Sequence, residues 1–162
     1  MRIGVVSDTH NNLVNCRKIV ALFNASGVEK VIHTGDITQP KTLEIFSDLN
    51  VPLYGVYGNN DIGELGVLKS SVKKHGFCFA EPPLELNWSD TNIVVVHDPL
   101  ELNGIDLDQY QLILHGHTHL ETINRKDGQL VFNPGECAGH MVGLNSIGIV
   151  GLQDLSTEIL RF

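Results

Sequence analysis

Short apolar runs alternate with amphipathic segments in the first half of the chain. Runs at residues 2–7, 31–33 and 53–57 have the length and composition of buried strands. Between them, residues 13–23 and the segment after Pro40 carry apolar side chains at helical spacing. This strand–helix–strand–helix–strand order predicts a parallel sheet with right-handed crossovers.

The second half of the chain is rich in strand-like segments and poor in helical ones. After a helical segment at 66–74, only a turn near 99–102 suggests further helix. We expect a second, mixed or antiparallel sheet that packs on the first, in an α/β fold with helices outside both sheets. The strand candidates are 84–88, 92–96, 112–114, 122–125, 130–133, 147–152 and 157–160.

Length and composition are those of one compact unit. We expect residues 1–162 to form a single domain, because neither a repeat nor a linker interrupts the pattern. No apolar run is long enough to cross a bilayer, and the first residues are typical of a buried strand rather than a signal peptide. We therefore expect a soluble, cytoplasmic protein that does not bind membranes.

The negative net charge of the chain limits which partners it is expected to bind and favours the binding of cations. The formal net charge is −8 and no basic run occurs, which argues against duplex nucleic acid as a partner. An enzyme of this charge with an anionic substrate needs local positive charge, which divalent cations would supply. The three cysteines are far apart and form no CxxC pair, so we interpret them as reduced structural thiols.

Polar side chains that can bind metals follow the ends of five predicted strands. In open α/β sheets, loops at the carboxyl ends of the strands converge at one edge, so these side chains are expected to meet there. The candidates are Asp8, His10, Asp36, Asn59, His97, His117 and His119.

The types of these side chains favour two hard-to-borderline divalent ions. Carboxylate, amide and imidazole groups suit manganese, nickel, iron, zinc or magnesium, and the absence of thiolates argues against a structural zinc site. Seven ligands exceed the needs of one tetrahedral ion, whereas two ions that share a bridging carboxylate use them all. Each segment alone also fits an ordinary turn, and His97 alone fits a core histidine. Their combination at five strand ends favours the metal site.

Five motifs carry a family resemblance: Ser7-Asp8-Thr9-His10, Gly35-Asp36, Gly58-Asn59-Asn60-Asp61, the strand ending at His97, and Gly116-His117-Thr118-His119. In this order they resemble the motifs of the calcineurin-like metallophosphoesterase superfamily. The short length and the Asn133-Pro134-Gly135-Glu136 loop resemble its small single-domain archaeal and bacterial group, which is related to the phosphoesterase-like subunit of retromer.

The resemblance implies a fold and a ligand set. The implied fold is a four-layer α/β/β/α sandwich of two mixed sheets flanked by helices. The implied first ion lies on Asp8, His10, Asp36 and His119. The implied second ion lies on Asp36, Asn59, His97 and His117, with Asp36 as the bridge.

Two residues depart from the family pattern. Asn60 stands where many larger members carry a histidine that protonates the leaving group, a contribution typically worth about 10²–10⁴-fold in rate. Asp98 stands where the family commonly has glycine. Its carboxylate would orient a ligand, repel a substrate phosphate or donate a proton, and adjacent cations disfavour the last role.

Other polar residues carry lesser expectations. His33 and His115 are expected in the core or beside a ligand that they orient, and Asp61 is expected to fix the loop of Asn59. Glu136 either lines the cleft or is a solvated loop carboxylate, and His140 is expected at the surface.

The functional hypothesis is a divalent-metal-dependent phosphodiesterase in which a metal-bridging hydroxide attacks phosphorus. Asp36, Asn59 and Asn60 are the expected catalytic residues, with Asn59 also donating an amide hydrogen bond to the phosphate. Two divalent cations, manganese or nickel first, and a small phosphodiester substrate are expected, and a homo-oligomer is left open. The alternative is a scaffold of the same fold that binds proteins with little or no catalysis.

Overall fold

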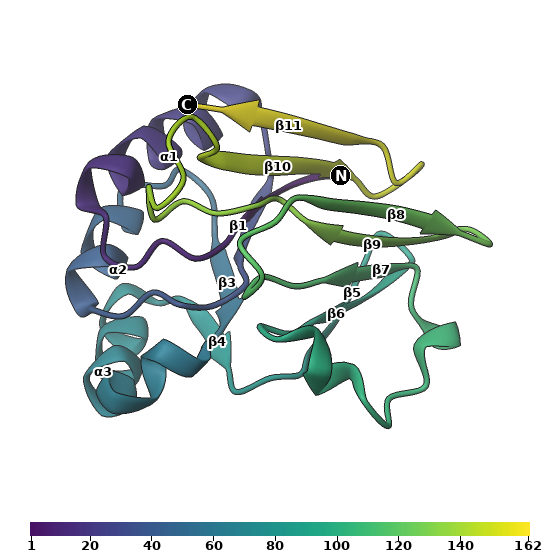
Figure 1. Ribbon diagram of the computed structural model, residues 1–162, viewed down its shortest axis with the longest axis horizontal. Coiled ribbons are helices and arrows are strands. Elements are labelled where there is room, and N and C mark those ends of the chain that lie inside the picture. The colour runs from purple at the N-terminus through teal and green to yellow at the C-terminus, as the bar shows by residue number, and fades with distance from the viewer.

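Two mixed β-sheets pack against each other in the computed structural model, which describes residues 1–162 (Figure 1). The first sheet contains β1 (Arg2–Val6), β2 (Lys30–His33), β3 (Leu53–Val56), β4 (Cys78–Ala80), β10 (Ser146–Gly151) and β11 (Thr157–Arg161) in the order β11-β10-β1-β2-β3-β4. The second contains β5 (Leu84–Trp88), β6 (Thr91–Val95), β7 (Leu112–Leu114), β8 (Thr122–Lys126) and β9 (Gln129–Asn133) in the order β5-β6-β7-β9-β8. The expected pair of mixed sheets is confirmed.

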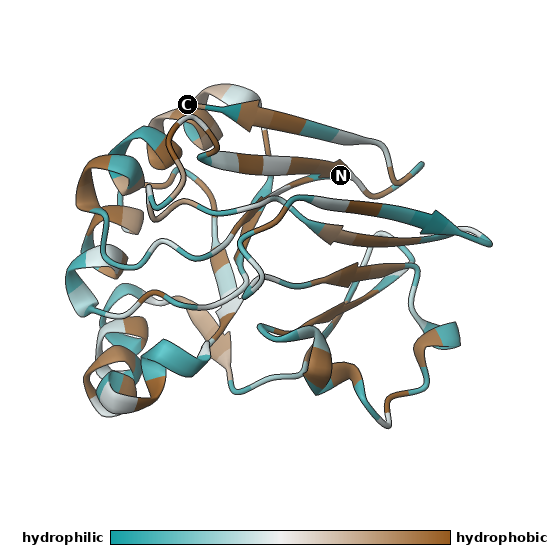
Figure 2. Ribbon diagram, viewed as in Figure 1, coloured by the Kyte–Doolittle hydropathy of each residue, from teal (hydrophilic) through white to brown (hydrophobic).

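Apolar side chains from both sheets form the central core. Ile3 and Ile32 of the first sheet belong to one buried cluster with Ile93, Leu112 and Phe132 of the second. Figure 2 shows apolar residues along β7 and β9 and mainly polar ones along β8, an exposed edge strand. Burial of this shared apolar surface holds the two sheets together.

Three α-helices cover the outer face of the first sheet: α1 (Leu13–Ser26), α2 (Pro40–Phe46) and α3 (Leu65–His75). The side chain of Asn12 caps α1 by accepting a hydrogen bond of 3.1 Å from the backbone N–H of Asn15, and Gly27 ends it in the left-handed conformation at φ 69°. No helix combines the length and apolar character that a membrane span requires.

The helical layer over the second sheet is thinner than the layer of α-helices over the first sheet. It contains the short 3-10 helices η2 (Pro99–Leu102) and η3 (Leu107–Gln109), and Leu102 and Leu107 pack there on buried Val94 and Ile113. A third 3-10 helix, η1 (Asn59–Glu64), precedes α3. The fourth layer of the expected sandwich is thus built from single helical turns.

The last two strands were expected in the second sheet, and this part of the prediction is wrong. β10 pairs antiparallel with β1, and β11 pairs antiparallel with β10, which makes the first sheet mixed. Residues 146–150 of β10 are all buried, as an internal strand requires. The short edge strand β4 was not predicted.

Parallel pairing places the functional loops. β1, β2 and β3 run parallel in the first sheet, and β6, β7 and β9 run parallel in the second. The segments that follow these strands therefore lie at the carboxyl edge of their own sheet, where polar groups from distant parts of the sequence converge.

Candidate metal centre

All seven sequence-predicted metal ligands lie in one group. They come from the segments after β1, β2, β3, β6 and β7, and each has a ligand atom within 3.8 Å of another member. The members are Asp8, His10, Asp36, Asn59, His97, His117 and His119.

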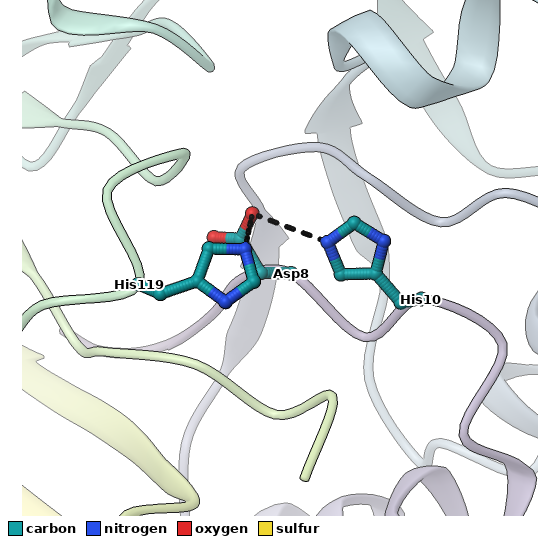
Figure 3. A group of neighbouring side chains, drawn as sticks. All are labelled: Asp8, His10 and His119. Carbon is teal, nitrogen blue, oxygen red and sulfur yellow. Dashed lines mark ion pairs between the residues drawn. The ribbon is translucent and has the colours of Figure 1, made fainter. Parts of the chain in front are cut away.

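Asp8, His10 and His119 form one half of the group (Figure 3). The Oδ1 atom of Asp8 lies 3.8 Å from Nε2 of His10 and 3.4 Å from Nε2 of His119. Asp8 Oδ1 and His10 Nε2 are buried, yet neither makes a hydrogen bond. Buried polar atoms without partners are costly, so this half fits a cation that all three side chains would bind.

Asn59, His97 and His117 form the other half. The Oδ1 atom of Asn59 lies 3.0 Å from Nε2 of His97 and 3.0 Å from Nδ1 of His117. The two imidazole nitrogens are 3.3 Å apart. One carbonyl oxygen and two imidazole nitrogens thus face a common point, a donor set that suits a borderline divalent ion.

Asp36 lies between the two halves. Its Oδ2 atom is 3.3 Å from Nε2 of His10, and its Oδ1 atom is 3.4 Å from Nε2 of His97. One carboxylate therefore presents a different oxygen to each set of side chains, the arrangement that a ligand shared by two cations needs.

Asn60 holds the Asp36 carboxylate. Its backbone N–H donates to Asp36 Oδ1 at 3.0 Å, and its side-chain amide donates to Asp36 Oδ2 at 2.7 Å. An amide has no proton to transfer at neutral pH. The contacts of Asn60 therefore hold the Asp36 carboxylate in one orientation and offer no acidic proton.

Asp36 and His97 shift each other's pKa. Burial disfavours the protonated imidazole, but the hydrogen bond and charge of Asp36 outweigh burial and raise the pKa of His97 to about 9. Burial also opposes ionisation of Asp36, but hydrogen bonds from His97 and Asn60 hold the pKa of Asp36 well below its usual range. Burial raises the pKa of Asp8 and lowers that of His10.

The backbone is strained at the site. Asp8, His10, Asp36, His117 and His119 all have positive φ, with values of 51°, 40°, 59°, 64° and 60°. Such conformations cost of order 1–3 kcal/mol each in non-glycine residues and concentrate at functional sites. Two glycines permit the close approach of the loops, because a Cβ at Gly58 would overlap the Asp36 carboxylate and one at Gly116 would overlap Ser7.

The lesser candidates have defined places. His33 is fully buried and lies 3.0 Å from the Thr9 hydroxyl, and His115 is also buried, which agrees with their expected core positions. Asp98 caps η2, its Oδ1 accepting from the backbone N–H of Leu100 at 2.9 Å, while its Oδ2 lies 3.6 Å from Nε2 of His117.

Two further residues lie near the centre but outside the predicted ligand set. For Glu136 the sequence left open a cleft position and a solvated one; it is fully buried, and its Oε2 lies 3.5 Å from Nδ1 of His119. His140 is exposed, as expected, but its ring lies 5.4 Å from those of both His10 and His119. The Asn133–Glu136 turn was the signal in the sequence that could have located these residues. It indicates a loop, but it does not indicate that the loop lies beside His119.

Comparisons with known proteins agree with this geometry. The calcineurin-like phosphoesterase superfamily domain matches residues 1–155. A phosphodiesterase of Methanocaldococcus jannaschii is 36% identical over 155 residues, in a match that covers 93% of this chain and 92% of that protein.

Solved structures of other proteins also resemble this chain. The structure of an archaeal phosphodiesterase is 33% identical and matches with a TM-score of 0.90 over 100% of both chains. Zinc-complexed Vps29 of Entamoeba histolytica is 18% identical, with a TM-score of 0.66 over 100% of this chain and 98% of that one. The second likeness is one of fold alone.

Proposed function

The chain belongs to the calcineurin-like phosphoesterase superfamily, and from this premise we propose that it is a phosphodiesterase that works with two divalent cations. The observation that carries the proposal is the position of Asp36, whose two oxygens face His10 on one side and His97 on the other. A carboxylate so placed suits a bridge between two ions.

The ligands divide into two sets that share Asp36. The first cation would be held by Asp8, His10, Asp36 and His119, and the second by Asp36, Asn59, His97 and His117. The unpartnered atoms of Asp8 and His10 support the first set. This donor chemistry suits manganese, nickel, iron, zinc or magnesium, and we favour manganese or nickel for the assays.

The protein groups around the ions would bind and orient the phosphate. When bound, two cations would lower the pKa of a bound water, supply a hydroxide nucleophile and balance phosphate charge. The amide nitrogen of Asn59 is a hydrogen-bond donor suited to a non-bridging phosphate oxygen. Asn60 would keep the Asp36 carboxylate in place through its two hydrogen bonds.

The charge around the site favours a diester. The segments 8–12, 35–40, 58–64, 97–103, 116–121 and 133–145 contain no lysine or arginine, but they do contain carboxylates such as Glu64 and Glu121. Without these basic side chains, bound cations would have to neutralise the negative charge of the phosphate. A diester carries one negative charge where a monoester dianion carries two, so a small phosphodiester is the substrate class that this surface accepts best. The same acidity disfavours duplex nucleic acid.

The experiment compares wild type with Asp36→Asn in a metal-titrated assay with an aryl phosphodiester. Wild type is expected to require manganese or nickel. The variant is expected to lose more than about 100-fold in kcat/KM, since even partners outside the ligand set typically cost 10–100-fold. Asp127→Asn, at the exposed tip between β8 and β9, is the matched control and should keep wild-type activity.

Folding must be checked in parallel by circular dichroism and thermal unfolding. Turnover by folded Asp36→Asn at the wild-type rate would contradict the proposed centre. An absence of turnover in both proteins with every ion would instead favour the scaffold alternative.

A further inference from the structure

We propose that Glu136 and Asp98 are positioning residues that hold His119 and His117 in opposite tautomers, one carboxylate for each cation. The inference rests on the two-cation site of the proposed function. It assigns roles to two carboxylates that lie outside the set of seven ligands.

The two imidazole rings of the Gly116–His119 segment are turned in opposite ways. His119 directs Nε2 toward Asp8 at 3.4 Å and Nδ1 toward Glu136 at 3.5 Å. His117 directs Nδ1 toward Asn59 at 3.0 Å and Nε2 toward Asp98 at 3.6 Å. In each ring, one nitrogen faces a member of the ligand group, Asp8 or Asn59, and the other faces a carboxylate outside that group.

A neutral imidazole has one lone pair and one N–H, on different nitrogens. His119 can therefore bind a cation through Nε2 only if its proton is on Nδ1, the atom that faces Glu136. His117 can bind through Nδ1 only if its proton is on Nε2, the atom that faces Asp98. A carboxylate accepts hydrogen bonds and does not donate them, so each one favours the tautomer that the adjacent cation needs.

Glu136 is held in place for this role. It is fully buried, and its oxygens accept hydrogen bonds from the backbone N–H groups of Met141 at 2.7 Å and Ala138 at 3.0 Å. No lysine or arginine pairs with it, although a buried carboxylate needs compensation. The N–H of His119, with a cation on the opposite nitrogen, is the compensating group that the geometry offers.

Asp98, which faces His117, is more exposed than Glu136. Its side chain is 28% exposed, and one oxygen already accepts from the backbone N–H of Leu100, which leaves the other to face His117. The separations of 3.5 and 3.6 Å to the two histidines are electrostatic contacts rather than formed hydrogen bonds. Because solvent screens Asp98 more, its removal should have the smaller effect.

A third cation on His119, Glu136 and His140 is the competing interpretation, because their ligand atoms lie within 4.8 Å of one another. It would take the lone pair of His119 Nδ1, and so remove that ring from the set with Asp8. The hydrogen bonds favour the first arrangement, since the Glu136 oxygens already have partners whereas Asp8 Oδ1 and His10 Nε2 have none.

The first test reads the tautomers directly. Nitrogen-15 NMR of histidine-labelled, zinc-loaded wild type should place the proton of His119 on Nδ1 and that of His117 on Nε2. Zinc titration should reach two ions per chain. The opposite tautomer of either ring, or a third ion that is lost in His140→Ala, overturns the inference.

The second test measures the affinity for manganese alone by calorimetry. Glu136→Gln and Asp98→Asn should each weaken one of the two sites, by about 10–100-fold for Glu136 and less for Asp98. Glu101→Gln is the matched control, because Glu101 lies beside Asp98 and accepts from the backbone N–H groups of His97 and Asp98 but pairs with no imidazole. Thermal unfolding of the metal-free variants separates lost positioning from lost folding.

Each outcome of the second test is decisive. Unchanged affinities in Glu136→Gln and Asp98→Asn, or an equal loss in Glu101→Gln, overturn the inference. If Glu136→Gln does not fold, the Asp98 variant and the tautomers of wild type still decide it. Wild type that binds two ions but hydrolyses no diester would refute the proposed function alone, whereas wild type that binds no ion would refute both.

Discussion

Asp61 accepts a hydrogen bond of 3.0 Å from the backbone N–H of Asp36, a residue 25 positions earlier in the chain. The same buried carboxylate accepts from the N–H groups of Gly58 at 2.7 Å and Thr38 at 2.6 Å. The bond to Gly58 fixes the loop of Asn59, as the sequence led us to expect, and the bonds to Asp36 and Thr38 also fasten it to the loop after β2. These loops carry Asp36 and Asn59, one ligand candidate from each.

The first prediction concerns Asp61→Asn. The amide keeps one acceptor oxygen but directs an NH₂ donor at backbone N–H groups, which leaves buried donors unsatisfied. We expect a loss of about 1–3 kcal/mol in the free energy of unfolding of the metal-free protein, measured in urea. Asp127→Asn, on an exposed turn, should change it by less than about 0.5 kcal/mol. An unchanged urea midpoint for Asp61→Asn would show that the loops are held by other contacts.

The second prediction concerns proton release when metal binds. The pKa of His97 is raised to about 9, so its imidazole is protonated at pH 7.5 in the metal-free protein. A cation can bind Nε2 only after this proton leaves, so His97 should contribute about one released proton at pH 7.5 and progressively less as the pH rises through 9. Affinity should accordingly rise with pH up to about 9.

Calorimetry in two buffers of different ionisation enthalpy measures this release. His97→Asn serves as the comparison, because it retains a side-chain oxygen but has no proton to lose in this range. Binding to wild type without proton release at pH 7.5 would contradict the charge coupling between Asp36 and His97.

The third prediction concerns acid stability. Burial lowers the pKa of His33 to about 3, whereas an unfolded histidine has a pKa of about 6.5. Between these values the unfolded chain binds a proton that the folded protein does not. His33 therefore lowers stability as pH falls below about 6.5, by up to about 1.4 kcal/mol per pH unit, and has no such effect above it.

His33→Asn tests this point. The Nδ1 atom of His33 accepts from the backbone N–H of Gly35 at 3.1 Å, a contact that the asparagine oxygen can take over. We expect the metal-free variant to be less stable at pH 7 but to have a flatter stability curve between pH 6.5 and 4, measured by urea unfolding at several pH values. Parallel curves for the two proteins would mean that His33 does not titrate as proposed.

Local patterns in the sequence were enough to predict most elements and the seven candidate ligands. Apolar periodicity located α1, and polar residues at strand ends gave the group around Asp36. Both depend on contacts that are near in sequence, or on the general rule that parallel strands end at one edge of a sheet.

The parts that were missed depend on long-range pairing. Nothing in residues 146–151 distinguishes a partner of β1 from a strand of the second sheet, because either place buries the same apolar side chains. The position of Glu136 also depends on which sheet contains β10. Its loop connects β9 of the second sheet to β10 of the first, and this connection places it beside His119. A solvated loop carboxylate and a buried one have the same sequence signature.

The last prediction concerns the leaving group. Asn60 orients Asp36 but cannot donate a proton, so wild type should hydrolyse diesters with aryl leaving groups much faster than those with alkyl leaving groups. Asn60→His supplies a general acid but also removes the amide donor to Asp36, so we expect it to raise the ratio of kcat/KM for an alkyl diester to kcat/KM for an aryl diester by up to about 100-fold. Asn60→Ala is the control: it removes the hydrogen bond to Asp36 and should slow both substrates by a similar factor. If Asn60→His also changed both substrates by the same factor, its effect would come from Asp36 rather than from proton transfer, and protonation of the leaving group would not limit the wild-type reaction.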